Sequence, residues 1–242
     1  IYAPTIVEDY VDFVSDDLIG VPIGDLELFD KMTNKHCVSM SGLGKSVTGA
    51  IEIALFDILA RKARLPLFKY LSDIPLDQIP PHSLACYYSG GSVVLSPDQI
   101  TEDVERAISL GFNAFKMRVG YQNNDLDRVK AAREALDGRF LICDAVQSTL
   151  HSWDLNESVQ NLRKMSKYDL LFAEEFVDPS DPQAVSYLKD NTDVDLAFGE
   201  SFTTINEFDS LCGRQCLDVA QPDVTQCGGL RAMQKICGLV RD

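Results

Sequence analysis

Short apolar runs alternate with amphipathic stretches through most of the chain. The apolar runs predict six strands, over Ser83–Tyr88, Ala114–Val119, Phe140–Asp144, Leu170–Phe176, Leu196–Glu200 and Leu217–Val224. Helical periodicity predicts helices over Ser96–Leu110, Asp125–Leu136, Asn156–Ser166, Pro182–Asp190, Thr204–Cys212 and Leu230–Leu239. Strict alternation of strand and helix with short loops is typical of an α/β fold with a parallel sheet.

The first 80 residues have helical periodicity instead. Apolar residues at helical spacing, from Ile51 to Leu59, lie within a segment from Val47 to Tyr70, and Pro66 is expected to end that helix. We therefore predict a helical domain over residues 1–80 and an α/β domain over residues 81–242. A closed (β/α)8 barrel needs more units than the predicted strands supply, so the sheet is expected to be open or the sequence part of a longer protein.

Composition and charge exclude several classes of protein. Lys and Arg number 22 against 37 Asp and Glu, giving a formal charge of −15 without a basic stripe, which argues against binding to nucleic acid or to an anionic membrane surface. The sequence contains no apolar run of 18 residues, so we predict no transmembrane helix. The seven cysteines are odd in number and form no CxxC pair, so we expect reduced core residues in a cytoplasmic protein.

Three acidic residues stand where predicted strands end. Asp144, Glu174 and Glu200 each close an apolar run, at spacings of about one strand–helix–strand repeat of roughly 30 residues. The carboxyl ends of parallel strands meet at one edge of a sheet, where like charges repel unless a cation lies between them. Carboxylate oxygens favour Mg2+, with Mn2+ as the second choice. Alternatively, each acid only ends a strand or caps a helix.

Two basic residues share one face of the second predicted strand. Alternation places Lys116 and Arg118 together, either facing the carboxylates or exposed to solvent. On the inner face, desolvation would lower the pKa of Lys116 enough for it to act as a base, whereas Arg118 stays charged and can only stabilise an anion. Asp223, at the end of the sixth strand, could orient a base, act as one, or cap its loop.

In their order along the chain, these residues resemble the enolase superfamily, and within it the mandelate racemase subgroup with its acid-sugar dehydratases. The residues that carry the resemblance are Lys116-x-Arg118, Asp144-Ala145, Glu174-Glu175, Gly199-Glu200-Ser201, Gln221-Pro222-Asp223 and Cys227-Gly228-Gly229, with the helix that begins Ala50-Ile51-Glu52. The resemblance implies an enolase-type (β/α)-barrel, truncated to about six β/α units, after a partial helical capping domain.

The same resemblance implies roles for the site residues. Asp144, Glu174 and Glu200 would bind Mg2+. Lys116 would be the base on one face of the substrate, with Arg118 in place of a second lysine, and Asp223 would be the acid that pairs with a histidine on a seventh strand. That strand is absent from this sequence, and Val146 and Phe176 replace an asparagine and a proline usual in the family.

The activity implied is Mg2+-dependent removal of the α-proton of a small carboxylate substrate through an enediolate, above all the dehydration of a sugar acid. A racemase, epimerase or muconate cycloisomerase-like isomerase is the alternative, because these reactions share the first step. A further alternative is a catalytically inactive fragment that only binds metal. Exposed strand edges and apolar helix faces of an incomplete barrel would favour homo-oligomers.

Overall fold

The computed structural model describes residues 4–37, 42–72, 84–147 and 152–241, together with the single residues 75 and 78. Contacts divide the chain into two compact units. The first comprises Ile1–His82, Glu200–Asp209 and Pro222–Asp242, and the second comprises Ser83–Gly199 and Ser210–Gln221. The predicted domains, residues 1–80 and 81–242, divide the chain by sequence order, and that division stays a prediction.

The second unit contains a parallel sheet of six strands in sequence order, which confirms the predicted α/β fold class. The strands are β1 (Tyr88–Ser89), β2 (Ala114–Arg118), β3 (Phe140–Asp144), β4 (Leu170–Glu174), β5 (Leu196–Phe198) and β6 (Val219–Ala220). Strand β1 overlaps the predicted strand Ser83–Tyr88 at Tyr88 alone, and residue 83 lies outside the described residues. Strand β6 is shorter than the predicted Leu217–Val224, because only Val219 and Ala220 are in register with β5. The central strands begin at the predicted residues.

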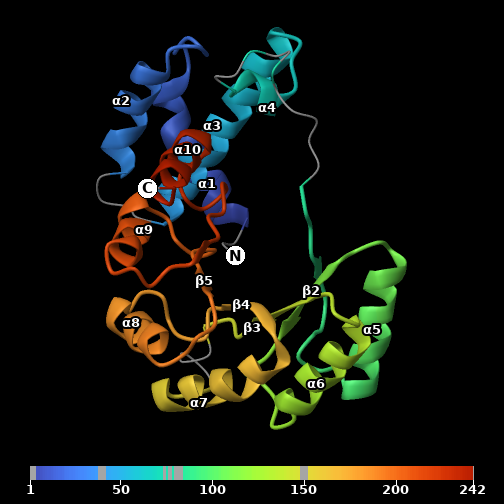
Figure 1. The fold of residues 1–242 in the computed structure, drawn as a ribbon. Coiled ribbons are helices and arrows are strands. Elements are labelled where there is room, and N and C mark those ends of the chain that lie inside the picture. The colour runs from blue at the N-terminus through green and yellow to red at the C-terminus, as the bar shows by residue number, and fades with distance from the viewer. Residues whose placement is uncertain are drawn as a thin grey trace. The chain divides into compact units, whose positions relative to one another are not determined.

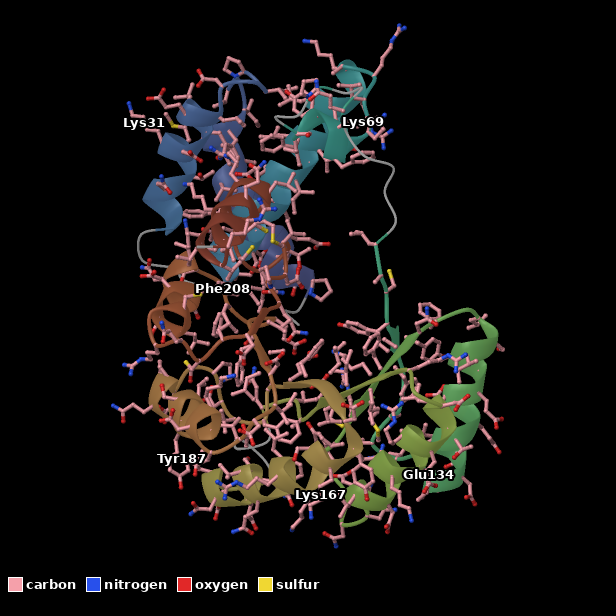
Figure 2. All side chains as sticks on the ribbon, in the orientation of Figure 1. Lys31, Lys69, Glu134, Lys167, Tyr187 and Phe208 are labelled. Atoms are coloured by element: carbon pink, nitrogen blue, oxygen red, sulfur yellow. The ribbon has the colours of Figure 1, made fainter. Side chains whose placement is uncertain are left out.

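Helices connect the strands of the second unit. They are α5 (Pro97–Ser109), α6 (Asp125–Leu136), α7 (Leu155–Met165), the 3-10 turn η2 (Ser166–Tyr168) and α8 (Pro182–Asp190), and α9 (Ile205–Cys212) follows β5 (Figure 1). Helices α5 and α7 begin with reciprocal capping boxes, at Ser96 and Asp154, which satisfy backbone N–H groups left free in the first turn. Charged residues such as Glu134 and Lys167 point to solvent (Figure 2).

The two faces of the sheet have different contents. Phe115 and Met117 of β2 are fully buried, and Phe115 stacks on Tyr88 at 5.9 Å between ring centroids. The opposite face carries a cluster of Ile142 and Phe172 with Ala197 and Val219. Lys116 is in register with Ile142, so its side chain lies on the same face as this cluster. On that face, a polar group follows the apolar cluster toward the carboxyl ends of the strands.

The first unit is helical, as predicted for its N-terminal part. It contains α1 (Pro4–Leu18), α2 (Leu26–Cys37), α3 (Leu43–Lys62), α4 (Leu67–Tyr70) and α10 (Leu230–Leu239). Tyr10 and Val14 of α1 pack on Val47 of α3. Helix α3 begins earlier than expected and ends before Pro66, which opens α4. Within the described part of the chain, no helix has the length and apolarity to cross a membrane.

A salt-bridge network ties α10 to the N-terminal helices. Arg231 binds Asp30 of α2 at 2.6 and 2.8 Å and Glu52 of α3 at 2.7 and 2.9 Å. Gly49 allows the close approach, because a Cβ atom there would lie 2.7 Å from the backbone nitrogen of Gly229. The helices of the first unit are therefore joined by charge as well as by apolar contact.

The cysteines only partly follow the prediction that they are core residues. Cys143, Cys216 and Cys227 are buried, whereas Cys86 and Cys237 are exposed. Apolar neighbours in the sequence do not ensure burial: Cys86 precedes the first strand and Cys237 lies on an exposed side of α10. These five thiols form no disulfide within the described residues.

Candidate functional site

Strand register brings three of the six predicted site residues together at the carboxyl edge of the sheet. Asp144 of β3 is in register with Glu174 of β4, and Arg118 of β2 is in register with Asp144. Lys116, two residues before Arg118, projects from the same face and reaches both carboxylates. Lys116, Asp144 and Glu174 are 9%, 3% and 1% exposed, so they form a buried charged cluster.

The Lys116 ammonium lies between the two carboxylates. Its Nζ donates to Glu174 Oε1 at 2.8 Å and to Oε2 at 3.0 Å, and lies 3.2 Å from Asp144 Oδ2. Burial opposes the charge on Lys116, but Asp144 and Glu174 outweigh burial and raise the pKa of Lys116 above its ordinary value. The expected lowering of this pKa is therefore wrong for this arrangement, because sequence alone does not show how closely the carboxylates approach.

Two more side chains contact this cluster. Gln221, which follows β6, donates its Nε2 to Glu174 Oε2 at 2.9 Å. The Tyr87 ring faces the Lys116 ammonium, 5.6 Å from the ring centroid, a cation–π geometry. In the sequence, Gln221 enters only as part of the motif Gln221-Pro222-Asp223, and no role is predicted for it. The role of Tyr87 left no signal in the sequence.

The backbone just beyond β3 and β4 adopts unusual conformations. Val146 and Glu175 have φ values of 48° and 50°, in the left-handed region that β-branched valine rarely adopts. Their positions are fixed by hydrogen bonds from Val146 N to Asp144 Oδ1 at 2.9 Å and from Glu175 N to the Ala197 carbonyl at 3.1 Å. Strained backbone of this kind is concentrated at functional sites, because the surrounding structure must hold it.

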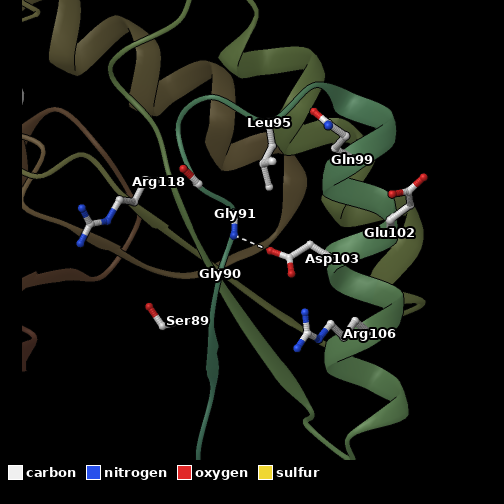
Figure 3. A pocket seen from close by; sticks show the side chains of 10 residues that line it. Ser89, Gly90, Gly91, Leu95, Gln99, Glu102, Asp103, Arg106 and Arg118 are labelled. Atoms are coloured by element: carbon white, nitrogen blue, oxygen red, sulfur yellow. Dashed lines mark hydrogen bonds between the residues drawn. The ribbon is translucent and has the colours of Figure 1, made fainter.

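The other predicted residues lie elsewhere. Arg118 is at the exposed end of β2, and within the described residues its guanidinium forms no ion pair with Asp144 or Glu174. It lines a cavity of about 600 Å³ beside the loop after β1, together with Gly91 and Asp103 (Figure 3). In this cavity wall, the Gly91 backbone N–H donates to Asp103 at 2.7 Å (Figure 3).

Glu200 and Asp223 belong to the first compact unit. Asp223 Oδ1 accepts hydrogen bonds from the backbone N–H and the hydroxyl of Thr225, both at 2.7 Å, which is the loop-capping arrangement allowed for in the sequence. The prediction that Glu200 and Asp223 join the cluster at the carboxyl edge of the sheet stays a prediction.

The cluster has oxygen donors that suit a hard divalent cation. Asp144 and Glu174 supply two buried carboxylates against a single ammonium, which leaves an excess of one negative charge. Gln221 Oε1 is buried and receives no hydrogen bond from the described residues. Carboxylate and amide oxygens are typical ligands of Mg2+. Among the described residues, no group of three or more acidic, histidine or cysteine side chains is already arranged around a metal position.

Comparison with known proteins connects this chain to a family. A family model described as "Enolase C-terminal domain-like" matches residues 99–242. The L-talarate/galactarate dehydratase of Salmonella typhimurium is 32% identical over 235 residues, which are 93% of this chain and 56% of that protein. The chain thus spans little more than half of this relative's length.

Solved structures also resemble this chain in fold. A racemase from Streptomyces coelicolor, solved with bound magnesium, superimposes with a TM-score of 0.87 at 25% identity, over 99% of this chain and 66% of that one. The L-talarate dehydratase from a Polaromonas species, complexed with Mg and L-glucarate, gives 0.84 at 28% identity, over 97% and 62%. The family match and the agreement in fold confirm the resemblance: the chain belongs to the enolase superfamily.

Proposed function

We propose that this chain removes the α-proton of a small carboxylate substrate in a Mg2+-dependent reaction that proceeds through an enediolate, and that the overall reaction is dehydration of a sugar acid. The observation that carries the proposal is the buried Lys116–Asp144–Glu174 cluster at the carboxyl edge of a parallel sheet. In such sheets this edge is where catalytic residues lie.

Each residue has a distinct part in this proposal. Asp144 and Glu174, with Glu200 as the third predicted ligand, would hold Mg2+, whose charge stabilises the negative charge that develops on the substrate carboxylate. Lys116 would accept the α-proton at Nζ. While both carboxylates remain uncompensated, they keep Lys116 protonated; once their charge is balanced, burial of the amine favours its neutral form.

Arg118 and Asp223 have roles that do not require them to contact Lys116. Arg118 has a planar guanidinium, which suits paired hydrogen bonds to a carboxylate, so it would bind an anionic group of the substrate at the mouth of the site. Asp223 would assist proton transfer on the opposite face of the substrate, which requires a partner base. Both roles rest on the family resemblance.

The relatives support a sugar acid as the substrate class. One of them is a dehydratase of L-talarate and galactarate, and a structural neighbour was solved with L-glucarate bound. We infer that six-carbon sugar diacids are the first substrates to test. Homo-oligomerisation and a cytoplasmic location stay predictions, and no observation points to nucleic acid as a partner.

Exchange of the α-proton in D2O tests the proposal whichever product is formed. The protein is incubated with a panel of sugar diacids and Mg2+, and deuterium incorporation is measured by NMR. We expect exchange with at least one acid, loss of exchange in EDTA, and loss in Lys116→Met. Lys189→Met is the matched control, because Lys189 also pairs with a carboxylate, Asp218, on the partly exposed outer side of the same unit.

The mass of the product separates the two reaction classes. Loss of 18 Da (about one water) identifies a dehydratase, and an isomeric product identifies a racemase or cycloisomerase, a class represented among the relatives by the 3,6-anhydro-alpha-L-galactonate cycloisomerase of Streptomyces coelicolor. Absence of exchange with every acid, alongside Mg2+ binding by calorimetry, would refute the proposal and favour a chain that only binds metal.

A further inference from the structure

Arg128 of α6 is a fully buried charged side chain close to the candidate site. It is 0% exposed and pairs with Asp125, its Nη1 lying 2.6 Å from Asp125 Oδ1. A buried ion pair loses its hydration and is seldom kept for stability alone, because apolar residues of similar volume often stabilise a fold equally well. The other N–H groups of this guanidinium form hydrogen bonds that indicate a second role for the pair.

The guanidinium donates hydrogen bonds to four backbone carbonyls, which belong to two separate segments. Three belong to the loop that follows β1: Nε donates to Leu95 at 2.9 Å, and Nη2 donates to Ser92 at 2.7 Å and to Gly91 at 3.2 Å. The fourth is the carbonyl of Arg118, the last residue of β2, at 3.1 Å from Nη1. Figure 3 shows Gly91 and Leu95 in this loop and Arg118 on the adjoining strand.

These contacts lead directly to the candidate site. The Arg118 N–H donates to the Gly91 carbonyl at 3.1 Å, so both backbone groups of Arg118 are held. The next N–H, of Val119, donates to the Asp144 carbonyl at 2.8 Å. Asp125 in turn accepts the Gly120 N–H at 2.7 Å. The Arg128–Asp125 pair therefore holds the backbone at Arg118 and Gly120, just beyond Lys116 at the end of β2.

We propose that Arg128 is a positioning residue, which holds the carboxyl ends of β1 and β2 so that Lys116 meets Asp144 and Glu174. Only a planar guanidinium can reach four carbonyls and a carboxylate at once, since a lysine ammonium has three donors at one point. The catalytic role of the residues that Arg128 positions rests on the proposed function. The holding of the backbone by Arg128 does not depend on it.

Arg128→Lys is the informative variant, because it keeps the charge opposite Asp125 while it removes most of the carbonyl contacts. Arg133→Lys is the matched control on the same helix. Arg133 also donates to backbone carbonyls, those of Arg139 and Asp169, but these residues precede β3 and β4 at the opposite edge of the sheet. Arg128 is fully buried and Arg133 only half-buried, so a purely structural role predicts a larger loss of stability for Arg128→Lys, without a selective loss of kcat in the folded protein.

Two measurements on the full chain decide between these roles. In the proton-exchange assay with Mg2+, we expect Arg128→Lys to lower kcat at least 10-fold while Arg133→Lys stays within twofold. By amide hydrogen exchange, we expect Arg128→Lys to reduce protection at Arg118 and Val119 at least 10-fold, with the strand amides of Ile142 and Ala173 changed less than twofold.

Equal effects of both variants on kcat, or unchanged protection at Arg118 and Val119, would overturn the positioning role. Should the parent chain exchange no substrate proton, the proposed function fails, and amide exchange alone then decides whether Arg128 fixes the end of β2. If Arg128→Lys does not fold, the double variant Asp125→Asn with Arg128→Gln removes the ion pair without leaving a buried charge, and the same two outcomes apply to it.

Discussion

Replacing Lys116 with Met tests the central cluster most directly. The substitution keeps an unbranched side chain of similar length and removes the ammonium that lies 2.8 Å from Glu174 and 3.2 Å from Asp144. Two carboxylates, each no more than 5% exposed at the side chain, are then left without their cation. Removing one partner of a buried ion pair costs about 3–5 kcal/mol, and we expect Lys116→Met to lose about that much in EDTA.

Mg2+ should then restore part of the loss. A ligand that binds only the folded state stabilises it by about 2.7 kcal/mol at roughly 100 times its Kd. Because the lysine and the metal compete for the same oxygens, Mg2+ should stabilise Lys116→Met more than it stabilises the parent chain. Urea unfolding followed by circular dichroism, with Mg2+ and with EDTA, measures both quantities.

Lys189→Met is the control for the loss of a lysine as such. Its ion pair with Asp218 has side chains 28% and 26% exposed, so we expect a loss of about 1 kcal/mol and no dependence on Mg2+. A loss below about 1 kcal/mol for Lys116→Met in EDTA would refute the account of the cluster as a buried charged site. Equal stabilisation of the parent and Lys116→Met by Mg2+ would show that the metal binds elsewhere.

Three other predictions concern packing and thiol chemistry. Gly49→Ala should lower the free energy of unfolding by about 1–3 kcal/mol, since its Cβ would press on the backbone before α10, whereas Gly238→Ala, with open space around it, should be neutral or stabilising in urea unfolding. Ile142→Ala should cost about 2–5 kcal/mol in the same assay, because it leaves a cavity in the cluster beneath the site. Burial raises the pKa of the Cys143 thiol, so at pH 8 a thiol reagent should label Cys86 at once and Cys143 only on unfolding, as followed by mass spectrometry.

Much of the fold is predictable from the sequence. The predicted boundaries of Phe140–Asp144 agree with β3, and Asp125–Leu136 agrees with α6, because apolar periodicity and the residues that end each element are local signals. The placement of Asp144 beside Glu174 follows equally from local signals, since in-register parallel strands bring equivalent positions together.

The remaining features depend on contacts between distant parts of the chain. The ion pairs of Arg231 with Asp30 and Glu52 join residues that show no periodic relation. Arg128 reads in sequence as an ordinary helix residue, and its burial becomes evident only once the loop after β1 lies over it. The pKa of Lys116 likewise depends on distances of a few ångströms that spacing along the chain does not fix.

The salt-bridge network of Arg231 has a consequence for the order of folding. It joins residues 179 and 201 positions apart, so the N-terminal helices gain these partners only after α10 has left the ribosome. Closing so long a loop carries an entropic cost before any contact compensates it, and such non-local contacts slow folding. During synthesis, Asp30 of α2 and Glu52 of α3 would therefore stay without this partner until α10 arrives, while the strands of the sheet pair with neighbours that emerge just before them.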